Sequence, residues 1–214
     1  WYVTGLHGEQ ETMGNLMFEG RATSVSEIDL LANGNKADLT EWVDTSPYLT
    51  GHSDIVALLV IQHQIEVQNT MTKASWDYRQ LMAEQGTVSA EKLAEFALPV
   101  LDALFMKNEA SLGDQIQGLS GFTEYFQNLG PFDNSTRSLR ELDLKQRVFK
   151  YPLSYLIYTD AFAALPEVLH TYLVDNIYQV LSADEDHTDY AHLDVATRAA
   201  ILEIVSVTAP GFFL

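Results

Sequence analysis

The stretch from Ser53 to Gln85 contains neither glycine nor proline. Because either residue would weaken or break a helix, this stretch predicts one long helix from about Ser53 to Met82, about 45 Å in length. Ser53 is a suitable N-cap, and Asp54 places a carboxylate at the positive end of the helix dipole. Residues 55–61 are all apolar, which predicts burial on every side of the first two turns.

Shorter helical segments are expected after the long one. The predicted ranges are 89–107, capped by Ser89 and interrupted by Pro99, then 122–129, 166–181 and 195–207, capped by Asp194. By contrast, residues 1–50 are irregular and rich in Gly, Asn, Asp and Thr. Within them, Trp1–Val3 and Leu16–Phe18 can pair as a short β-ribbon.

Nothing in the chain repeats at a fixed period, and no linker separates two compositional blocks. The sequence therefore predicts a mostly α fold with a single domain over residues 1–214. In this interpretation residues 1–50 form an irregular segment that wraps over a helical core of residues 51–214, and the long helix lies at its centre.

Charge excludes several classes of partner. Twelve Lys and Arg stand against 30 Asp and Glu, for a net charge of −18, and both halves of the chain are acidic. A surface of this sign repels nucleic acid and anionic lipid. The longest apolar run, residues 55–61, is far shorter than the roughly 20 residues that cross a bilayer. We expect no nucleic-acid partner and no membrane span.

The absence of cysteine narrows the chemistry further. It excludes disulfides, thiolate metal sites, thiol nucleophiles and covalent c-type haem attachment within these 214 residues. No phosphate-cradling glycine loop, dinucleotide fingerprint or His-Glu-x-x-His motif is present. The sequence thus favours a protein without a catalytic site of its own. The chain begins at Trp1, inside a strand-like stretch, and we expect an N-terminal portion to be missing.

His63 lies on the apolar stripe of the predicted long helix, so we expect its side chain in the core. It is either a hydrogen-bonded core residue or a ligand of haem or a metal ion. His52 has nearly the same azimuth but lies about 16 Å away along the axis. The two cannot bind one ion, but they can line two ends of one pocket. Glu66 is either a partner for the His63 imidazole or a plain surface carboxylate.

The glycine-rich opening segment contains His7 and Met13. Both side chains can serve as axial haem ligands, and glycine lets a backbone approach a flat cofactor closely. The alternative is that they are ordinary loop residues. A second feature is a basic cluster between Arg137 and Lys150, which includes Arg140. These side chains either pair with the chain's own carboxylates or clamp an anion such as the haem propionates.

Several stretches are distinctive when taken together: Trp-Tyr-Val-Thr-Gly-Leu-His-Gly at 1–8, Met-Gly-Asn at 13–15, His-Ser-Asp-Ile-Val-Ala-Leu at 52–58, His-Gln at 63–64, Gly-Phe at 121–122, Arg-Ser-Leu-Arg at 137–140, Phe-Lys-Tyr-Pro at 149–152 and Ser-Tyr-Leu-Ile-Tyr at 154–158. The chain resembles the C-terminal part of a family of exported bacterial proteins related to c-type cytochromes. This resemblance implies an exported, periplasmic, haem-associated protein whose C-x-x-C-H attachment segment lies upstream of these residues. It assigns no catalytic residue.

Two functional hypotheses follow. The first is a haem-associated periplasmic electron-transfer domain that completes the pocket of a haem-bearing segment or partner protein. Its candidate metal ligands are His7, Met13 and His63, and His52, Arg137 and Arg140 are further candidates for contact with the cofactor. The second is a non-catalytic helical binding or scaffold module of a bacterial envelope complex. For the first hypothesis, we expect the opening segment to pack against the N-terminal half of the long helix.

Overall fold

The computed structural model describes residues 2–10, 21, 23–27, 36–185 and 188–213. Over these residues the chain is mostly α-helical and contains no named β-strand. The chain divides into two compact units: residues 1–61, 111–128 and 143–148 make the first, and residues 62–110, 129–142 and 149–214 make the second. Whether the two units act as one domain stays a prediction.

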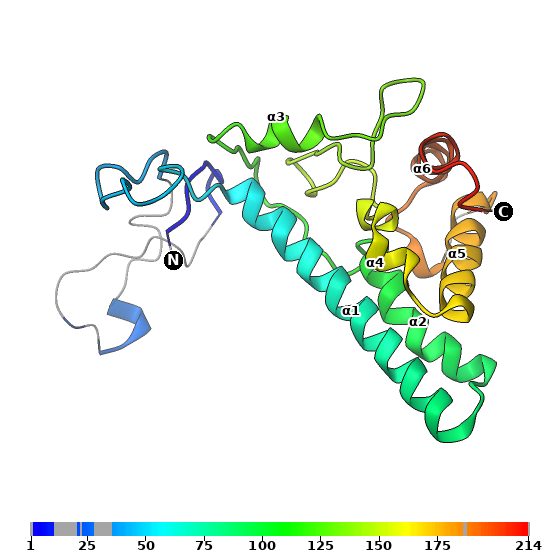
Figure 1. Ribbon diagram of the computed structural model, residues 1–214. Coiled ribbons are helices and arrows are strands. Elements are labelled where there is room, and N and C mark those ends of the chain that lie inside the picture. Colours follow the sequence, from blue (N-terminus) through cyan, green and yellow to red (C-terminus); the bar gives the residue numbers. More distant parts are fainter. Residues whose placement is uncertain (1, 11–20, 22, 28–35, 186–187, 214) are drawn as a thin grey trace. The chain divides into compact units, whose positions relative to one another are not determined.

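Helix α1 spans Ile55–Gln85 and is unbroken over its 31 residues, as the absence of glycine and proline predicted (Figure 1). Its N-cap differs from the expected one. The Asp54 carboxylate, not the Ser53 hydroxyl, accepts hydrogen bonds from the amide nitrogens of Val56 at 2.8 Å and Ala57 at 3.4 Å. Ser53 is instead engaged through its backbone, because its carbonyl accepts from Thr4 N at 2.8 Å.

The expectation of all-round burial at the start of α1 was wrong. Val56 and Val60 are buried, but Ile61 is 47% exposed, and the other residues of 55–61 are only half-buried. The buried pair are four residues apart and therefore share one face of the helix. The apolar run thus packs along one face, as in an ordinary amphipathic helix.

In the first unit, the opening segment contacts the first turn of α1. Thr4 forms a parallel bridge with Asp54, and the amide nitrogen of Ile55 donates to the Thr4 carbonyl at 2.8 Å. Leu6 forms an antiparallel bridge with Gln117. The predicted ribbon partner, Leu16–Phe18, lies outside the described residues. The first unit also contains helix α3, Phe122–Gln127.

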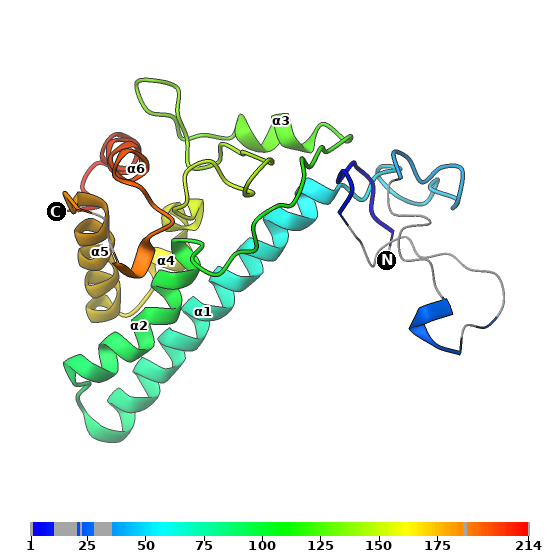
Figure 2. The same ribbon diagram turned by 180° about the vertical axis from the view of Figure 1, so that it is seen from behind.

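The second unit contains most of α1 and four further helices: α2 (Ala90–Leu104), α4 (Asp160–Ala163), α5 (Glu167–Ser182) and α6 (Val195–Thr208). Helix α5 packs against both α2 and α6, and Figures 1 and 2 show α5 beside α6. The predicted caps Ser89 and Asp194 are confirmed, since their side chains accept from Lys92 N and Thr197 N.

Three 3-10 turns complete the described elements. They span Val25–Glu27, Tyr155–Tyr158 and Thr188–Tyr190. The second of these turns and α4 lie outside the helical ranges that the sequence predicted. Ser154 and Thr159 start them, because each hydroxyl accepts a hydrogen bond from a backbone amide two or three residues later. No helix of the described residues is long and apolar enough to cross a membrane.

Candidate functional site

His63 is the centre of a buried polar cluster in the second unit. Its side chain is almost fully buried, as its position on the apolar stripe predicted. The ring nitrogen Nδ1 lies 2.5 Å from Glu109 Oε1, and Nε2 lies 2.8 Å from Ser154 Oγ. Both imidazole nitrogens are therefore occupied by protein partners. With a neutral ring, Nδ1–H donates to the carboxylate and Nε2 accepts from the hydroxyl.

A serine, a histidine and a carboxylate linked in this order also occur in hydrolase active sites. A catalytic serine, however, needs access to substrate and nearby donors for the oxyanion. Ser154 is fully buried, and its amide nitrogen donates to the Leu104 carbonyl at 2.8 Å. Its hydroxyl also accepts from Leu156 N at 3.3 Å. Instead, the hydrogen bonds of His63 connect α1 to Glu109 in the segment after α2 and to Ser154 at the start of the turn at Tyr155–Tyr158.

Aromatic rings surround the imidazole. The ring centroid of Phe149 lies 4.9 Å from that of His63, and the Tyr155 centroid lies 6.3 Å away. The Arg140 guanidinium sits 4.7 Å from the Tyr155 ring centroid and donates to the Gly130 carbonyl. Burial lowers the pKa of Arg140, although the group stays protonated at any ordinary pH. Arg140 thus supports the wall of the cluster through its stacking contact.

Arg137 forms two ion pairs within the second unit. Its guanidinium contacts Asp133 and Glu203, each at 2.7 Å. These two carboxylates raise the pKa of Arg137. Burial opposes ionisation of Asp133, but hydrogen bonds from the backbone and guanidinium of Arg137 outweigh it and lower the Asp133 pKa. Lys150 likewise pairs with Glu141. These contacts favour the interpretation in which the basic cluster pairs with the chain's own carboxylates.

Two further predicted site residues, His7 and His52, belong to the first unit. His7 is buried, and His52 is half-buried just before α1. Met13 lies outside the described residues. The glycines beside His7 are close to protein atoms: a Cβ on Gly8 would lie 2.0 Å from the Asp114 carboxylate, and one on Gly5 would meet Ile55 at 2.6 Å. Protein therefore fills the space beside both glycines.

Glu109 and Ser154, the two partners of His63, were not expected from the sequence. The candidate partner was Glu66, which is exposed. Glu109 and Ser154 lie 46 and 91 residues from His63 along the chain. No local signal connects residues so far apart. In the first unit, the role of Asp54 was also larger than predicted, because its carboxylate accepts from Ser120 Oγ at 2.6 Å and from Leu119 N at 3.0 Å.

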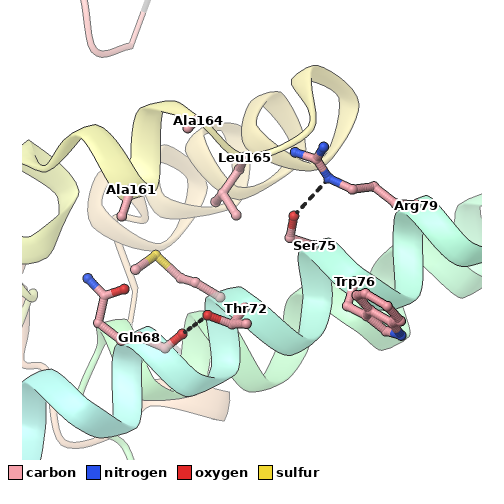
Figure 3. A pocket seen from close by; sticks show the side chains of 9 residues that line it. Gln68, Thr72, Ser75, Trp76, Arg79, Ala161, Ala164 and Leu165 are labelled. Carbon is pink, nitrogen blue, oxygen red and sulfur yellow. Dashed lines mark hydrogen bonds between the residues drawn. The ribbon is translucent and has the colours of Figure 1, made fainter.

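The second unit carries several grooves, among them one of about 210 Å³ between α1 and α2 and two larger ones. One, of about 290 Å³, runs between α1 and α4, and Figure 3 shows Ser75 and Arg79 of α1 joined by a hydrogen bond opposite Ala161 and Leu165. The other, of about 430 Å³, lies between α2 and α5. Its lining residues are Glu91, Ala94, Glu95, Leu98, Leu101, Tyr172, Asn176, Gln179, Val180, Asp189 and Tyr190. Neither of these two larger grooves is lined by a histidine.

The described partners of His63, Arg137 and Arg140 are groups of the protein itself. Axial ligation by His63 would require the loss of a hydrogen bond to Glu109 or Ser154. The described residues contain no group of three or more His, Asp and Glu side chains that could hold a metal ion. Arg137 forms ion pairs with two carboxylates. Arg140 lies over the ring of Tyr155 and donates a hydrogen bond to the Gly130 carbonyl. Haem as a cofactor stays a prediction.

No protein-family model, no curated protein and no solved structure matches the chain. The fold and the polar cluster describe a mostly α-helical acidic protein in which His63 is buried and hydrogen-bonded to Glu109 and Ser154.

Proposed function

We propose that this chain is a helical docking domain of a periplasmic electron-transfer system, which binds a basic, haem-bearing protein partner. The resemblance to proteins related to c-type cytochromes provides the context of export and haem. In this proposal the haem belongs to the partner, and the chain supplies the binding surface rather than catalysis. The proposal thus joins both hypotheses from the sequence, with binding as the main role.

The observation that carries the proposal is the charge. The net charge of −18 comes from acidic residues in both halves of the chain. Complementary charge steers association and raises the rate at which partners meet, and electron-transfer complexes are small, transient interfaces. The contacts of His63, Arg137 and Arg140 also support it, because the described partners of these residues lie within the chain.

The experiment is a calorimetric titration of the chain with a soluble, basic c-type cytochrome. We expect binding at about 10 mM salt that weakens strongly at about 500 mM salt, since screening shortens the reach of surface charges to a few ångströms. An acidic cytochrome serves as the control and should not bind. Absence of binding at low salt, or equal binding of both cytochromes, would contradict the proposal.

A further inference from the structure

The groove between α2 and α5 has an apolar floor. Leu101 and Val180 are buried at its base, whereas Leu98 is 52% exposed on the same face of α2. Ala94, Leu98 and Leu101 follow the spacing i, i+4 and i+7, which aligns them along one side of the helix. An apolar side chain placed in the groove would bury Leu98 and gain the corresponding hydrophobic free energy.

The rim of this groove is acidic. Three carboxylate residues line it, namely Glu91, Glu95 and Asp189. Two lysines adjoin them, but each already has a partner: Lys92 lies 2.7 Å from Glu95, and Lys107 lies 3.3 Å from Asp102. With Asp102, the partner of Lys107, four carboxylates stand against these two lysines, and the local charge is negative.

We propose that the groove between α2 and α5 binds one face of a cationic amphipathic helix from a protein partner. Apolar residues of that helix, spaced by three or four positions, enter the floor at Leu98, and its lysines or arginines face the acidic rim. This is the helix-in-groove mode of recognition. A volume of about 430 Å³ lies within the range of about 300–1,000 Å³ that is typical of ligand pockets.

The groove between α1 and α4 does not suit the same partner. Arg79 is its charged lining residue, and no carboxylate lines it. A cationic helix would meet repulsion there rather than attraction. The inference about the α2 and α5 groove rests on the proposed function, because it names the surface and the part of the partner that binds. It needs no haem, and it can therefore be tested separately.

The probe is a fluorescently labelled synthetic peptide of 14 residues, made of leucine and lysine. Its leucines are spaced by three or four positions, so that they share one face of a helix, and its lysines occupy the other face. Its binding is measured by fluorescence anisotropy with the full chain and two variants. Leu98→Gln removes the apolar contact in the groove, and Leu129→Gln is the matched control, because Leu129 is 51% exposed but does not line the groove. We expect Leu98→Gln to weaken binding roughly five- to tenfold and Leu129→Gln to change it less than about twofold.

Two further binding measurements distinguish binding in the groove from charge attraction alone. The double variant Glu91→Gln, Asp189→Asn should weaken binding and reduce its salt dependence. A peptide with glutamate in place of lysine should not bind. Equal effects of the two leucine substitutions, or binding that depends on charge alone, would overturn the groove proposal.

The same variants distinguish this inference from the proposed function. If the basic cytochrome binds and Leu98→Gln does not change the binding of the peptide, the groove proposal is refuted and the docking function is retained. If the peptide binds with the expected dependence on Leu98 but no cytochrome binds, the groove stands and the haem-bearing partner is wrong. Absence of binding by both probes overturns both.

Discussion

At the scale of single residues, two buried polar side chains organise the described chain, one in each unit. Asp54 caps α1 and also holds the loop at residues 118–120 through its carboxylate. His63 joins three segments through Glu109 and Ser154. A buried polar group that loses its partners costs about 1–3 kcal/mol, so each of these residues is a point at which the fold is vulnerable.

Replacement of Asp54 by alanine should lower the free energy of unfolding by about 1–3 kcal/mol, because the helix cap and the loop contacts are lost together. Ser53→Ala is the control and should change it by less than about 0.5 kcal/mol, since no hydrogen bond uses its hydroxyl as the cap. Urea titration measures both. A larger loss for Ser53→Ala than for Asp54→Ala would restore Ser53 as the cap.

The same carboxylate predicts a pH dependence. Burial raises the pKa of Asp54, but hydrogen bonds from Ser120 and the backbone amides outweigh it, and the net pKa is lowered. A lowered pKa in the folded state adds stability above the unfolded value of about 3.9, and this stability is lost as the pH falls through the folded value. Asp54→Ala should therefore show a smaller loss of stability than wild type between about pH 5 and pH 3.

Replacement of His63 by alanine should lower the free energy of unfolding by about 2–4 kcal/mol, because it leaves a cavity and two unpaired polar groups. The control is His170→Ala, since His170 contacts the Phe162 ring and is only half-buried. Ser154→Ala and the double variant then complete a cycle, in which coupling of at least about 0.5 kcal/mol is expected. A stable His63→Ala protein would argue against a structural role.

These residues mark what the sequence could and could not predict. The burial of His63 followed from its helical stripe, because periodicity reports which face meets the core. Its partners could not be predicted, since the fold alone brings Glu109 and Ser154 to it. The choice of Asp54 over Ser53 had a similar cause. Both are good caps locally, and the loop at residues 118–120 decides between them.

At the scale of elements, the helices with local start and stop signals were predicted, including the short α3 (Phe122–Gln127, predicted at 122–129), whereas α4 and the 3-10 turns were not. Helices α1, α2, α5 and α6 begin and end within a few residues of their predicted bounds, because caps, glycine and proline mark their ends. The turn at Tyr155–Tyr158 and helix α4 are too short for a periodic pattern. They are set by the hydroxyl caps of Ser154 and Thr159 and by packing in the second unit.

The end of α1 provides a prediction at this scale. Gly86 has a φ of +73°, and its amide nitrogen donates to the Met82 carbonyl at 2.9 Å. Nothing lies within 4 Å of a Cβ added there, so the cost of a side chain is conformational alone. Gly86→Ala should cost about 1–2 kcal/mol, and Gly86→Asn should cost less. Thermal unfolding measures both.

The control for this substitution is Gly113→Ala. Gly113 has no left-handed φ, and an added Cβ would come no closer than 3.5 Å to Gln10. We expect almost no change in the melting temperature for this variant. Equal losses at the two glycines would show that the left-handed backbone at the end of α1 carries no special cost.

At the scale of the whole molecule, charge and the groove between α2 and α5 carry the functional account. In the proposal, the net charge of −18 attracts a basic partner, and the apolar floor at Leu98 adds a contact that charge alone does not give. The charge is read directly from the composition. The groove could not be predicted, because it requires the packing of α5 on α2.

The most direct test that the partner docks at the groove between α2 and α5 is a nuclear magnetic resonance titration of the isotopically labelled chain with the basic cytochrome in its ferric form. A paramagnetic haem broadens the amide signals closest to it. The account predicts broadening at low salt around Leu98 and Asn176 in the groove, little change at Leu129, and loss of the effect at about 500 mM salt. Unchanged spectra at low salt, or broadening centred on His7 in the first unit, would contradict it.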